Sequence, residues 1–386
     1  MLVVSALAPP SRLLSRPNLG DITEYFGYAQ RTFDGQVPYR DFRVEYPPAF
    51  LPVVLAPGPT DSGYFNRFRL LMLALAAIAL ALLVGALYLV GAGLIELFAG
   101  ALLLATLPYT LGPGLAFERF DLWPAALLLA AVVALLKGSR VLAFATLAIG
   151  AVAKFFPIVA VPLALLALHG RRRTRRDLGA FAAAALAFTL PFMIVAPRGV
   201  GHVGRLLLRR PLHVESLGSS ILLAAHRLGV YEPTIYNSFA GSWDLAGPAA
   251  RIVAIVGTAV EAAALILVWV LFARGPRGSR ELLLAVAAAV AAFVTFGKVF
   301  SPQYMVWIAT AVPLALGRVR TFALLATLGA VLLTHYVYVD RYQDLLQAGE
   351  VSWLLLARNL LLVALFCALT IELATRRPRR LSAPRG

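Results

Sequence analysis

Residues 68–90, FRLLMLALAAIALALLVGALYLV, form an apolar run long enough to cross a bilayer as one helix, since such a helix needs roughly 20 mostly apolar residues. Further apolar segments follow at 97–112, 122–136, 141–168, 178–196, 251–273, 281–297, 303–316, 321–338 and 351–374. The 386-residue chain is 60% apolar and 14% charged, whereas soluble domains carry about 25% charged residues. We therefore exclude a soluble enzyme, a disordered chain and a disulfide scaffold. The single cysteine, Cys367, excludes an intrachain disulfide and a cysteine-based metal cluster.

The distribution of basic residues explains the formal net charge of +16 without a nucleic-acid partner. Lys and Arg are concentrated in five short segments with few acidic residues: 137–140, 171–176, 274–280, 318–320 and the tail 376–386. The positive-inside rule places such segments in the cytoplasm. We therefore expect the lipid bilayer as a partner and no nucleic acid. The richness in Ala, Leu and Arg indicates a high-GC genome and hence a bacterial plasma membrane.

The segment 141–168 fixes the number of membrane crossings. Both of its ends are basic and therefore cytoplasmic, so an even number of helices must lie between them. The sequence AKFFP, residues 153–157, lies in its middle. We predict two short helices, 141–152 and 157–168, that meet at a partly buried turn. The sequence thus predicts an all-α polytopic membrane protein, a single domain over residues 1–386, with about eleven transmembrane helices.

The first extracytoplasmic loop is expected at residues 21–67. Residues 1–20 before it resemble the end of a membrane helix whose beginning is missing. Residues 22–33 can form a short amphipathic helix with Tyr25 and Ala29 on its apolar side. We expect this helix to lie on the membrane surface.

A second long extracytoplasmic loop is expected at residues 197–250. Within it, residues 217–228 are typical of another helix at the outer surface, and this helix carries His226. Ser216 is a suitable N-cap for this helix and Gly229 a suitable stop.

Charged side chains in the first loop allow two interpretations. Asp21 immediately precedes residues 22–33, where an aspartate is a common helix N-cap. Arg40 and Asp41 can form an ion pair within a structural turn. Alternatively, Arg40, Asp41 and Glu45 line a polar cavity at the membrane surface.

Other charged residues interrupt apolar surroundings. A lysine at the centre of a membrane helix costs about 2.5–3.5 kcal/mol, so we expect Lys154 to face a cavity or a carboxylate. Glu261 is likewise a charged residue within an apolar helix, so its side chain also needs a polar surrounding. Lys298 lies in an outer turn, against the positive-inside rule, and needs a local reason. Arg119 lies in an outer loop, where it could be no more than a solvated charge.

Taken together, these motifs resemble those of glycosyltransferase family 87, which comprises polyprenyl-phosphate-mannose-dependent α-mannosyltransferases of the GT-C superfamily. The first block is Asp21…Tyr25…Gly35-x-x-Pro-Tyr-Arg-Asp-Phe…Glu45-Tyr-Pro-Pro. Further blocks follow in the same order: Arg119-Phe-Asp-Leu, Lys154-Phe-Phe-Pro, His213-Val-Glu-Ser-Leu and Lys298-Val-Phe-Ser-Pro-Gln-Tyr. The resemblance covers roughly residues 15–340.

The resemblance implies a GT-C fold and transfer of a sugar, mannose by analogy, from a polyprenyl-phosphate donor to an extracytoplasmic glycolipid or glycan acceptor. In GT-C enzymes the first extracytoplasmic loop carries the catalytic acid, so the resemblance assigns Asp21 as the base. Its other expected site residues are Arg40, Lys154, His213 and Lys298 near the donor phosphate, Asp41, Glu45 and Glu215 for sugar hydroxyls or for holding the cations, and Arg119 and His226 as further candidates.

The chemistry of this transfer is compatible with one carboxylate and several cations. A single base within hydrogen-bond reach activates the acceptor hydroxyl. The phosphate leaves without a general acid, because its second pKa is about 6, but its developing charge needs cations nearby. We therefore predict a single displacement with inversion and expect neither a divalent metal nor another cofactor. A two-carboxylate hydrolase would instead need paired acids and a water.

Two other classes of protein stay open at this point. A flippase or transporter of lipid-linked sugars would distribute polar residues through the bilayer on several helices, whereas here they gather at the outer boundary. A non-catalytic membrane protein with the GT-C fold would keep the helices without transferring sugar.

Overall fold

The computed structural model describes residues 21–167, 171–238 and 241–376, and this part of the chain is mostly helical. The α-helices are α2 (Ile22–Phe33), α3 (Leu51–Leu55), α4 (Asp61–Leu89), α5 (Leu94–Thr110), α6 (Pro113–Phe117), α7 (Leu122–Leu136), α8 (Arg140–Ala153), α9 (Val161–Ala167), α10 (Arg171–Val195), α11 (Pro197–Arg209), α12 (Leu217–Arg227), α13 (Pro248–Arg274), α14 (Ser279–Phe296), α15 (Met305–Ala311), α16 (Arg320–His335), α17 (Tyr342–Leu346) and α18 (Val351–Thr375). Shorter helical turns are η1 (Pro48–Phe50), η2 (Phe156–Ala160), η3 (Pro302–Tyr304), η4 (Val312–Leu314) and the π-helical η5 (Tyr336–Asp340).

Six segments in the described part are helical, long and apolar enough to cross a membrane: Gly63–Leu89, Thr174–Val195, Pro248–Arg274, Ser279–Phe296, Arg320–Asp340 and Val351–Thr375. Shorter apolar helices cover Leu94–Thr110, Leu122–Leu136, Arg140–Ala153 and Phe156–Ala167. The predicted all-α architecture with membrane-length helices is confirmed. The segment 303–316 is less regular than expected, because Pro302 and Pro313 divide it into η3, α15 and η4.

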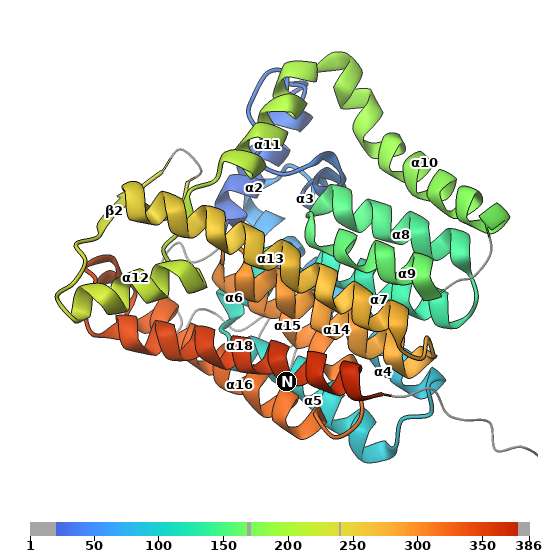
Figure 1. Cartoon of the computed structure of the whole chain (residues 1–386). Helices are drawn as coiled ribbons and strands as arrows, with labels where there is room; N and C mark the ends of the chain where they lie inside the picture. Colours follow the sequence, from blue (N-terminus) through green and yellow to red (C-terminus); the bar gives the residue numbers. More distant parts are fainter. Residues whose placement is uncertain (1–20, 168–170, 239–240, 377–386) are drawn as a thin grey trace, which may run out of the picture.

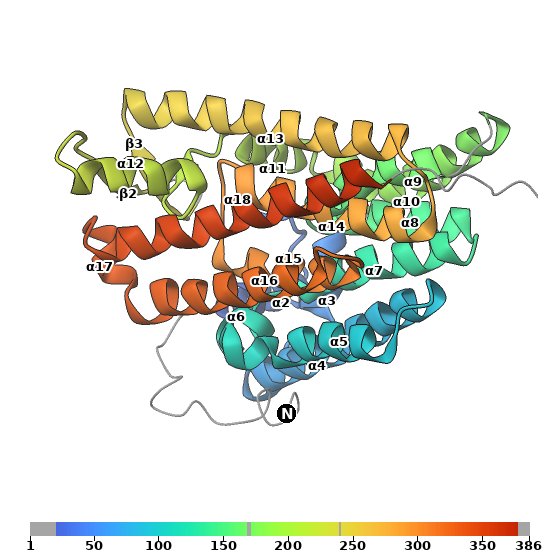
Figure 2. The same cartoon turned by 60° about the horizontal axis from the view of Figure 1, so that its bottom comes forward.

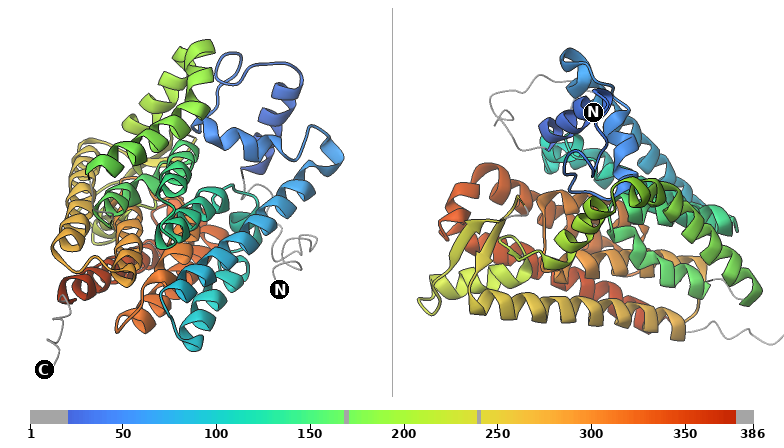
Figure 3. Two further views of the ribbon diagram at one scale, coloured as in Figure 1. Left: turned by 90° about the vertical axis from the view of Figure 1, so that its right-hand side faces the viewer. Right: turned by 90° about the horizontal axis from the view of Figure 1, so that it is seen from above.

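Helix α14 lies at the centre of the molecule and packs against α13 and α18. Every residue from Leu282 to Ala292 is buried, and the many alanines in this helix let its neighbours approach closely. Helices α13, α18 and α16 run side by side along the molecule (Figure 1 and Figure 2). Helices α4 and α13 lie on opposite sides of it (Figure 3). Large apolar side chains such as Ile194 and Ile255 remain exposed on the outer helices, as expected of surfaces that face lipid.

Contacts between basic residues and neighbouring loops hold one end of the bundle together. Arg280 donates to the backbone oxygen of Gly91 at 2.7 Å, and Arg376 pairs with Glu281 at 3.0 Å. Arg140 Nε donates to Asp177 at 2.9 Å. The basic loops and the end of α18 therefore lie at the same end of the molecule, on the right in Figure 1.

The predicted break within residues 141–168 is present. Helix α8 ends at Ala153, and Lys154 adopts an extended conformation with φ −158° and ψ 123°. Pro157 then begins the new helical stretch within η2, where its missing N–H is tolerated. The extended backbone at Lys154 therefore takes this residue out of the helical repeat of α8.

The expectation that residues 22–33 lie on the membrane surface is wrong. These residues form α2 as predicted, but Tyr25 and Ala29 are fully buried. The ring of Tyr25 packs edge-on against Phe50 at 5.2 Å and lies 5.6 Å from that of Phe68. The apolar side of α2 therefore packs onto the protein rather than onto lipid.

The loop 197–250 contains structure that the sequence pattern did not reveal. It begins with α11 and includes a small sheet of β1 (Leu212–His213), β2 (Thr234–Asn237) and β3 (Trp243–Ala246) in the order β1-β3-β2. The pairing is antiparallel and places His213 opposite Asp244. The predicted helix is α12: Ser216 Oγ accepts a hydrogen bond from Ser219 N at 3.2 Å, and Gly229 has φ +75°.

Candidate functional site

Asp21 occupies the N-cap position of α2, but its side chain does not cap the helix. Its Oδ2 atom instead accepts three hydrogen bonds, from Tyr25 Oη at 3.2 Å, Tyr46 Oη at 3.2 Å and Arg119 Nη1 at 3.0 Å. The interpretation of Asp21 as a mere helix cap therefore does not explain its environment.

The two oxygens of the Asp21 carboxylate differ. All three donors bind Oδ2, and Oδ1 accepts no hydrogen bond from the described residues. The side chain is 23% exposed. The three donors thus fix the orientation of the carboxylate through Oδ2, and no described residue donates to Oδ1.

Arg119 connects Asp21 to the C-terminal half of the chain. Its side chain is 10% exposed, and its Nη2 atom donates to Tyr338 Oη in η5 at 3.4 Å. Arg119 lies just before α7, in the short turn after α6. The solvated-loop interpretation of this arginine is therefore not what the structure shows.

Lys154 faces a carboxylate. A carboxylate and a cavity are the two environments expected for it from the sequence. Its Nζ atom lies 2.8 and 3.0 Å from the two oxygens of Asp121, which is itself buried. Four aromatic rings surround the ammonium group at 4.7–5.6 Å, a distance typical of cation–π contacts; they belong to Tyr46, Phe120, Tyr304 and Trp307.

Glu45 lies in a concentration of negative charge near Asp21. Burial raises its pKa to about 7, with a further increase from Glu24 and a smaller one from Asp21, while Arg210 opposes the shift. Glu24 is held by Tyr28, whose hydroxyl donates to it. Burial therefore favours the protonated form of Glu45, which can both donate and accept hydrogen bonds.

His213 and Glu215 belong to a buried cluster beside the small sheet. Burial and then the charge of Arg210 lower the pKa of His213 to about 3. This shift favours the neutral imidazole, which can still donate a hydrogen bond. Burial raises the pKa of Glu215 to about 7, opposed by Arg358, whose Nη1 lies 3.7 Å from its carboxylate.

Lys298 has a local reason for its place on this side of the protein. Its Nζ atom donates to the backbone oxygen of Leu208 at 3.0 Å, and its own backbone oxygen accepts from His213 N at 3.0 Å. The turn after α14 is thereby tied to the end of α11 and to β1.

In the described contacts, Arg40 and Asp41 are joined neither to Asp21 nor to the buried His213 and Glu215. Arg40 Nε and Nη2 donate to Asp41 at 2.8 and 2.9 Å, and the side chains are 53% and 33% exposed. Tyr39, at φ +67°, turns inward and packs against Phe192. The turn therefore buries the tyrosine and leaves the ion pair exposed, as the structural interpretation predicts. Of the three residues expected to line a polar cavity, only Glu45 is part of the polar surroundings of Asp21.

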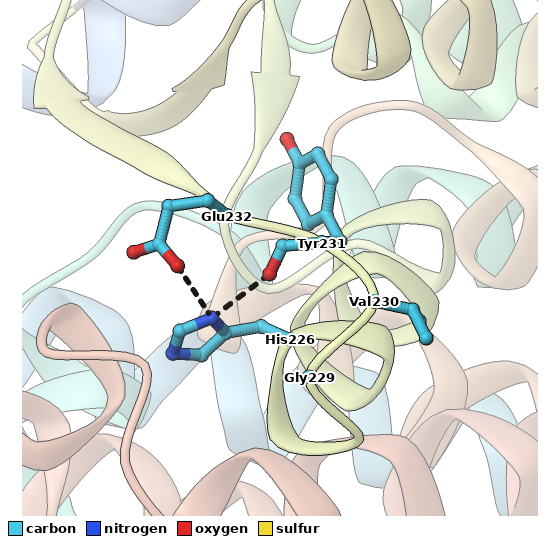
Figure 4. Close-up of a pocket in the computed structure, with 5 residues that line it drawn as sticks. All are labelled: His226, Gly229, Val230, Tyr231 and Glu232. Carbon is cyan, nitrogen blue, oxygen red and sulfur yellow. Dashed lines mark hydrogen bonds and ion pairs between the residues drawn. The ribbon is translucent and has the colours of Figure 1, made fainter.

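His226 lies in a separate place at the end of α12. Its Nδ1 atom is 2.9 Å from the backbone oxygen of Tyr231 and 3.4 Å from Glu232 (Figure 4). These residues line a small surface pocket with Gly229 and Val230. Nothing in the described contacts joins His226 to Asp21.

Three charged residues that pair with or act on the candidate site residues are not predicted from the sequence. They are Asp121, Arg210 and Arg358. Arg358 carried a usable signal, since an arginine inside an apolar helix is normally paired or functional. Asp121 was visible only as part of the Arg119 motif, and Arg210 as one of two adjacent arginines. Their partners come from distant parts of the chain, so sequence spacing alone could not identify them.

Comparison with known proteins adds no family assignment, because no protein-family model matches the chain and no curated protein shows significant similarity to it. In the described residues, no group of three or more His, Cys, Asp or Glu side chains is arranged to hold a metal ion. The arrangement around Asp21 therefore has to be judged on its own chemistry.

Proposed function

We propose that the chain is a membrane-embedded glycosyltransferase of the GT-C type, similar to family 87. It would transfer a sugar from a polyprenyl-phosphate donor to an extracytoplasmic glycolipid or glycan acceptor. Mannose is the first sugar to test, because the motifs resemble those of mannosyltransferases. The observation that carries the proposal is the asymmetry of Asp21: Oδ2 accepts three hydrogen bonds, while Oδ1 accepts none from the residues that the structure describes.

In the proposed reaction Asp21 Oδ1 accepts the proton of the acceptor hydroxyl as that oxygen bonds to the anomeric carbon of the donor sugar. The bond between this carbon and the phosphate oxygen breaks, and its electron pair leaves with the polyprenyl phosphate. Asp21 then releases the proton to water. One base acting in one step gives inversion at the anomeric carbon.

The position of the polar residues favours a transferase over a lipid flippase. Asp21, Arg119, Lys154 and Lys298 all lie at or beyond helix ends, whereas a flippase is expected to carry polar groups through the bilayer. The basic loops gather at the opposite end, which the positive-inside rule assigns to the cytoplasm. We therefore propose eleven crossings of a bacterial plasma membrane, with Asp21 on the extracytoplasmic side.

The test is transfer of labelled mannose from polyprenyl-phosphate-mannose in membranes that contain the native protein, Asp21→Asn or Asp34→Asn. Asp34 lies at the other end of α2 and is exposed, so it controls for the change of charge. We expect transfer by the native protein and by Asp34→Asn, loss in Asp21→Asn, and an α-linked product from the β-linked donor. Equal transfer by all three would remove Asp21 as the base. Movement of the donor lipid across the membrane without a new glycosidic bond would favour the flippase.

A further inference from the structure

Arg210 and Lys298 are two half-buried cations at the junction of α11, the small sheet and the turn after α14. Arg210 Nη2 donates to Ser242 Oγ at 3.2 Å, and that hydroxyl donates to Asp244 at 2.9 Å. Lys298 Nζ donates to the backbone oxygen of Leu208, two residues before Arg210. Both side chains are therefore held by neutral oxygen atoms.

Neither cation forms an ion pair within 4.0 Å in the part of the chain that the structure describes. The other cations of the cluster already have carboxylate partners: Arg119 with Asp21, Lys154 with Asp121 and Arg358 with Glu215. The buried Nε atom of Arg210 also has no hydrogen-bond partner among the described residues. Among the described residues, Arg210 and Lys298 thus lack the carboxylate partner that Arg119, Lys154 and Arg358 have.

Lys298 and Arg210 meet at the end of α11, since Lys298 Nζ binds the backbone oxygen two residues before Arg210. Burial lowers the pKa of Lys298, Glu261 opposes this shift, and the charge of Arg210 lowers it further. The charge of Arg210 also reaches Glu45 and His213. An anion bound between Arg210 and Lys298 would relieve their repulsion and would lie in the same polar cluster as Glu45.

The surface beside Arg210 suits a lipid rather than a soluble anion. Leu207 and Leu208 lie in the last turn of α11, shortly before Arg210, and are 41% and 80% exposed. Helix α11 follows directly on α10, the outer face of which is apolar and exposed. A phosphate held by Arg210 therefore lies next to apolar side chains that an isoprenoid chain can cover.

We propose that Arg210 and Lys298 form the subsite that binds the phosphate headgroup of an isoprenoid lipid. This inference rests on the proposed function, since it places the donor phosphate and the leaving group. It also moves the phosphate away from Arg40, Lys154 and His213, the first two of which are paired and the third of which is uncharged.

The experiment measures equilibrium binding to the purified full chain in nanodiscs of neutral phosphatidylcholine. The probes are a short-chain prenyl phosphate, the corresponding prenyl alcohol and inorganic phosphate. The variants are Arg210→Met, Lys298→Met and the charge-preserving Arg210→Lys. Arg205→Met is the matched control, because Arg205 is an exposed arginine of α11, the helix that ends just before Arg210.

We expect the native protein and Arg205→Met to prefer the prenyl phosphate over the alcohol. Each methionine variant should weaken phosphate binding by about tenfold or more, the range for loss of one charged hydrogen-bond partner. Arg210→Lys should retain most of the preference. If Arg210→Met fails to fold, Lys298→Met and the phosphate-to-alcohol preference of the native protein still decide.

Equal binding of phosphate and alcohol by the native protein, or native affinity in both methionine variants, would overturn the inference. Displacement of the lipid by an equal concentration of inorganic phosphate would assign the site to a soluble anion and overturn the lipid assignment. Binding needs no sugar transfer, so the two proposals fail separately. Phosphate binding that depends on Arg210 without transfer would reject the proposed function, and transfer that is unaffected in both variants would reject the subsite.

Discussion

Lys154 Nζ lies 2.8 and 3.0 Å from the two carboxylate oxygens of Asp121, so this buried ammonium group already has its counter-ion. The pair is linked to Asp21 in two ways. Asp121 follows two residues after Arg119, which binds Asp21 at 3.0 Å. The ring of Tyr46 lies 5.5 Å from Lys154, and its hydroxyl donates to Asp21. We therefore expect Lys154 to position Asp21 rather than to bind a phosphate.

Lys154→Met and Asp121→Asn should therefore slow transfer to a similar extent, by lowering kcat with little change in the donor KM. Each single variant should also lower the melting temperature, because breaking a buried ion pair costs about 3–5 kcal/mol. The double variant should be more stable than either single one, since it leaves no unpaired charge. Kinetics and thermal unfolding of the purified variants check both effects.

A direct contact between Lys154 and the donor phosphate would give a different pattern. Lys154→Met would then raise the donor KM, and Asp121→Asn, which keeps the lysine charge free, would leave it unchanged or lower it. Arg69→Met is a suitable control for the loss of one cation, since Arg69 pairs with Glu118 rather than with Asp21 or Asp121.

Tyr46→Phe removes one of the three donors to Asp21 Oδ2 and keeps the aromatic ring. A hydrogen bond to a charged group contributes about 1.5–3 kcal/mol, so kcat should fall by roughly tenfold to a hundredfold. Tyr64→Phe is the control, because the Tyr64 hydroxyl donates to a backbone oxygen at Val54. An unchanged kcat in Tyr46→Phe would show that the orientation of Asp21 does not depend on this donor.

Arg40→Gln and Asp41→Asn should leave transfer and the donor KM unchanged within about twofold, since exposed ion pairs contribute little. The Arg40 guanidinium and a backbone N–H lower the pKa of Asp41 to about 2, so the pair stays charged at all relevant pH values. Steady-state kinetics of both variants is the measurement. A large rise in the donor KM of Arg40→Gln would restore the arginine to the phosphate site.

The sequence predicted most of the fold, because apolar length and basic loops are local properties. The break at Lys154 is predictable for the same reason, since two cytoplasmic ends require an even number of helices. The environment of α2 is not, because an amphipathic helix has the same pattern whether its apolar side faces lipid or protein. The buried Tyr25 and its contacts with Phe50 and Phe68 depend on residues that only the fold brings together.

The candidate site was predicted in part. Asp21, Arg119 and Lys154 lie close together, but the sequence could not show which cations are already paired. Lys154 was a candidate for the phosphate only because Asp121 was not recognised as its partner. Arg210 was overlooked because its place is set by the small sheet, whose strands are too short to leave a periodic signal.

The proposed topology can be tested by replacing the single native cysteine and introducing a new cysteine at a chosen position. In a Cys367→Ser background, Glu232→Cys should react with a membrane-impermeant maleimide on intact cells, because Glu232 is 88% exposed at the end proposed to be extracytoplasmic. Arg318→Cys should react only after the cells are opened. Labelling of both in intact cells would contradict the placement of the basic loops in the cytoplasm.

Glu45 should make stability depend on pH. Burial and Glu24 raise its pKa from 4.5 to about 7 in the folded protein. The folded protein then binds a proton that the unfolded chain releases, so the free energy of unfolding falls as the pH rises from about 4.5 to about 7. Glu45→Gln stays neutral and escapes this loss. The melting temperature of Glu45→Gln relative to that of the native protein should therefore rise between pH 5 and pH 8. Glu232→Gln alters an exposed side chain, so its melting temperature should change with pH as that of the native protein does. A gap between Glu45→Gln and the native protein that stays constant with pH would show that the Glu45 carboxylate titrates at the same pH in the folded and unfolded states.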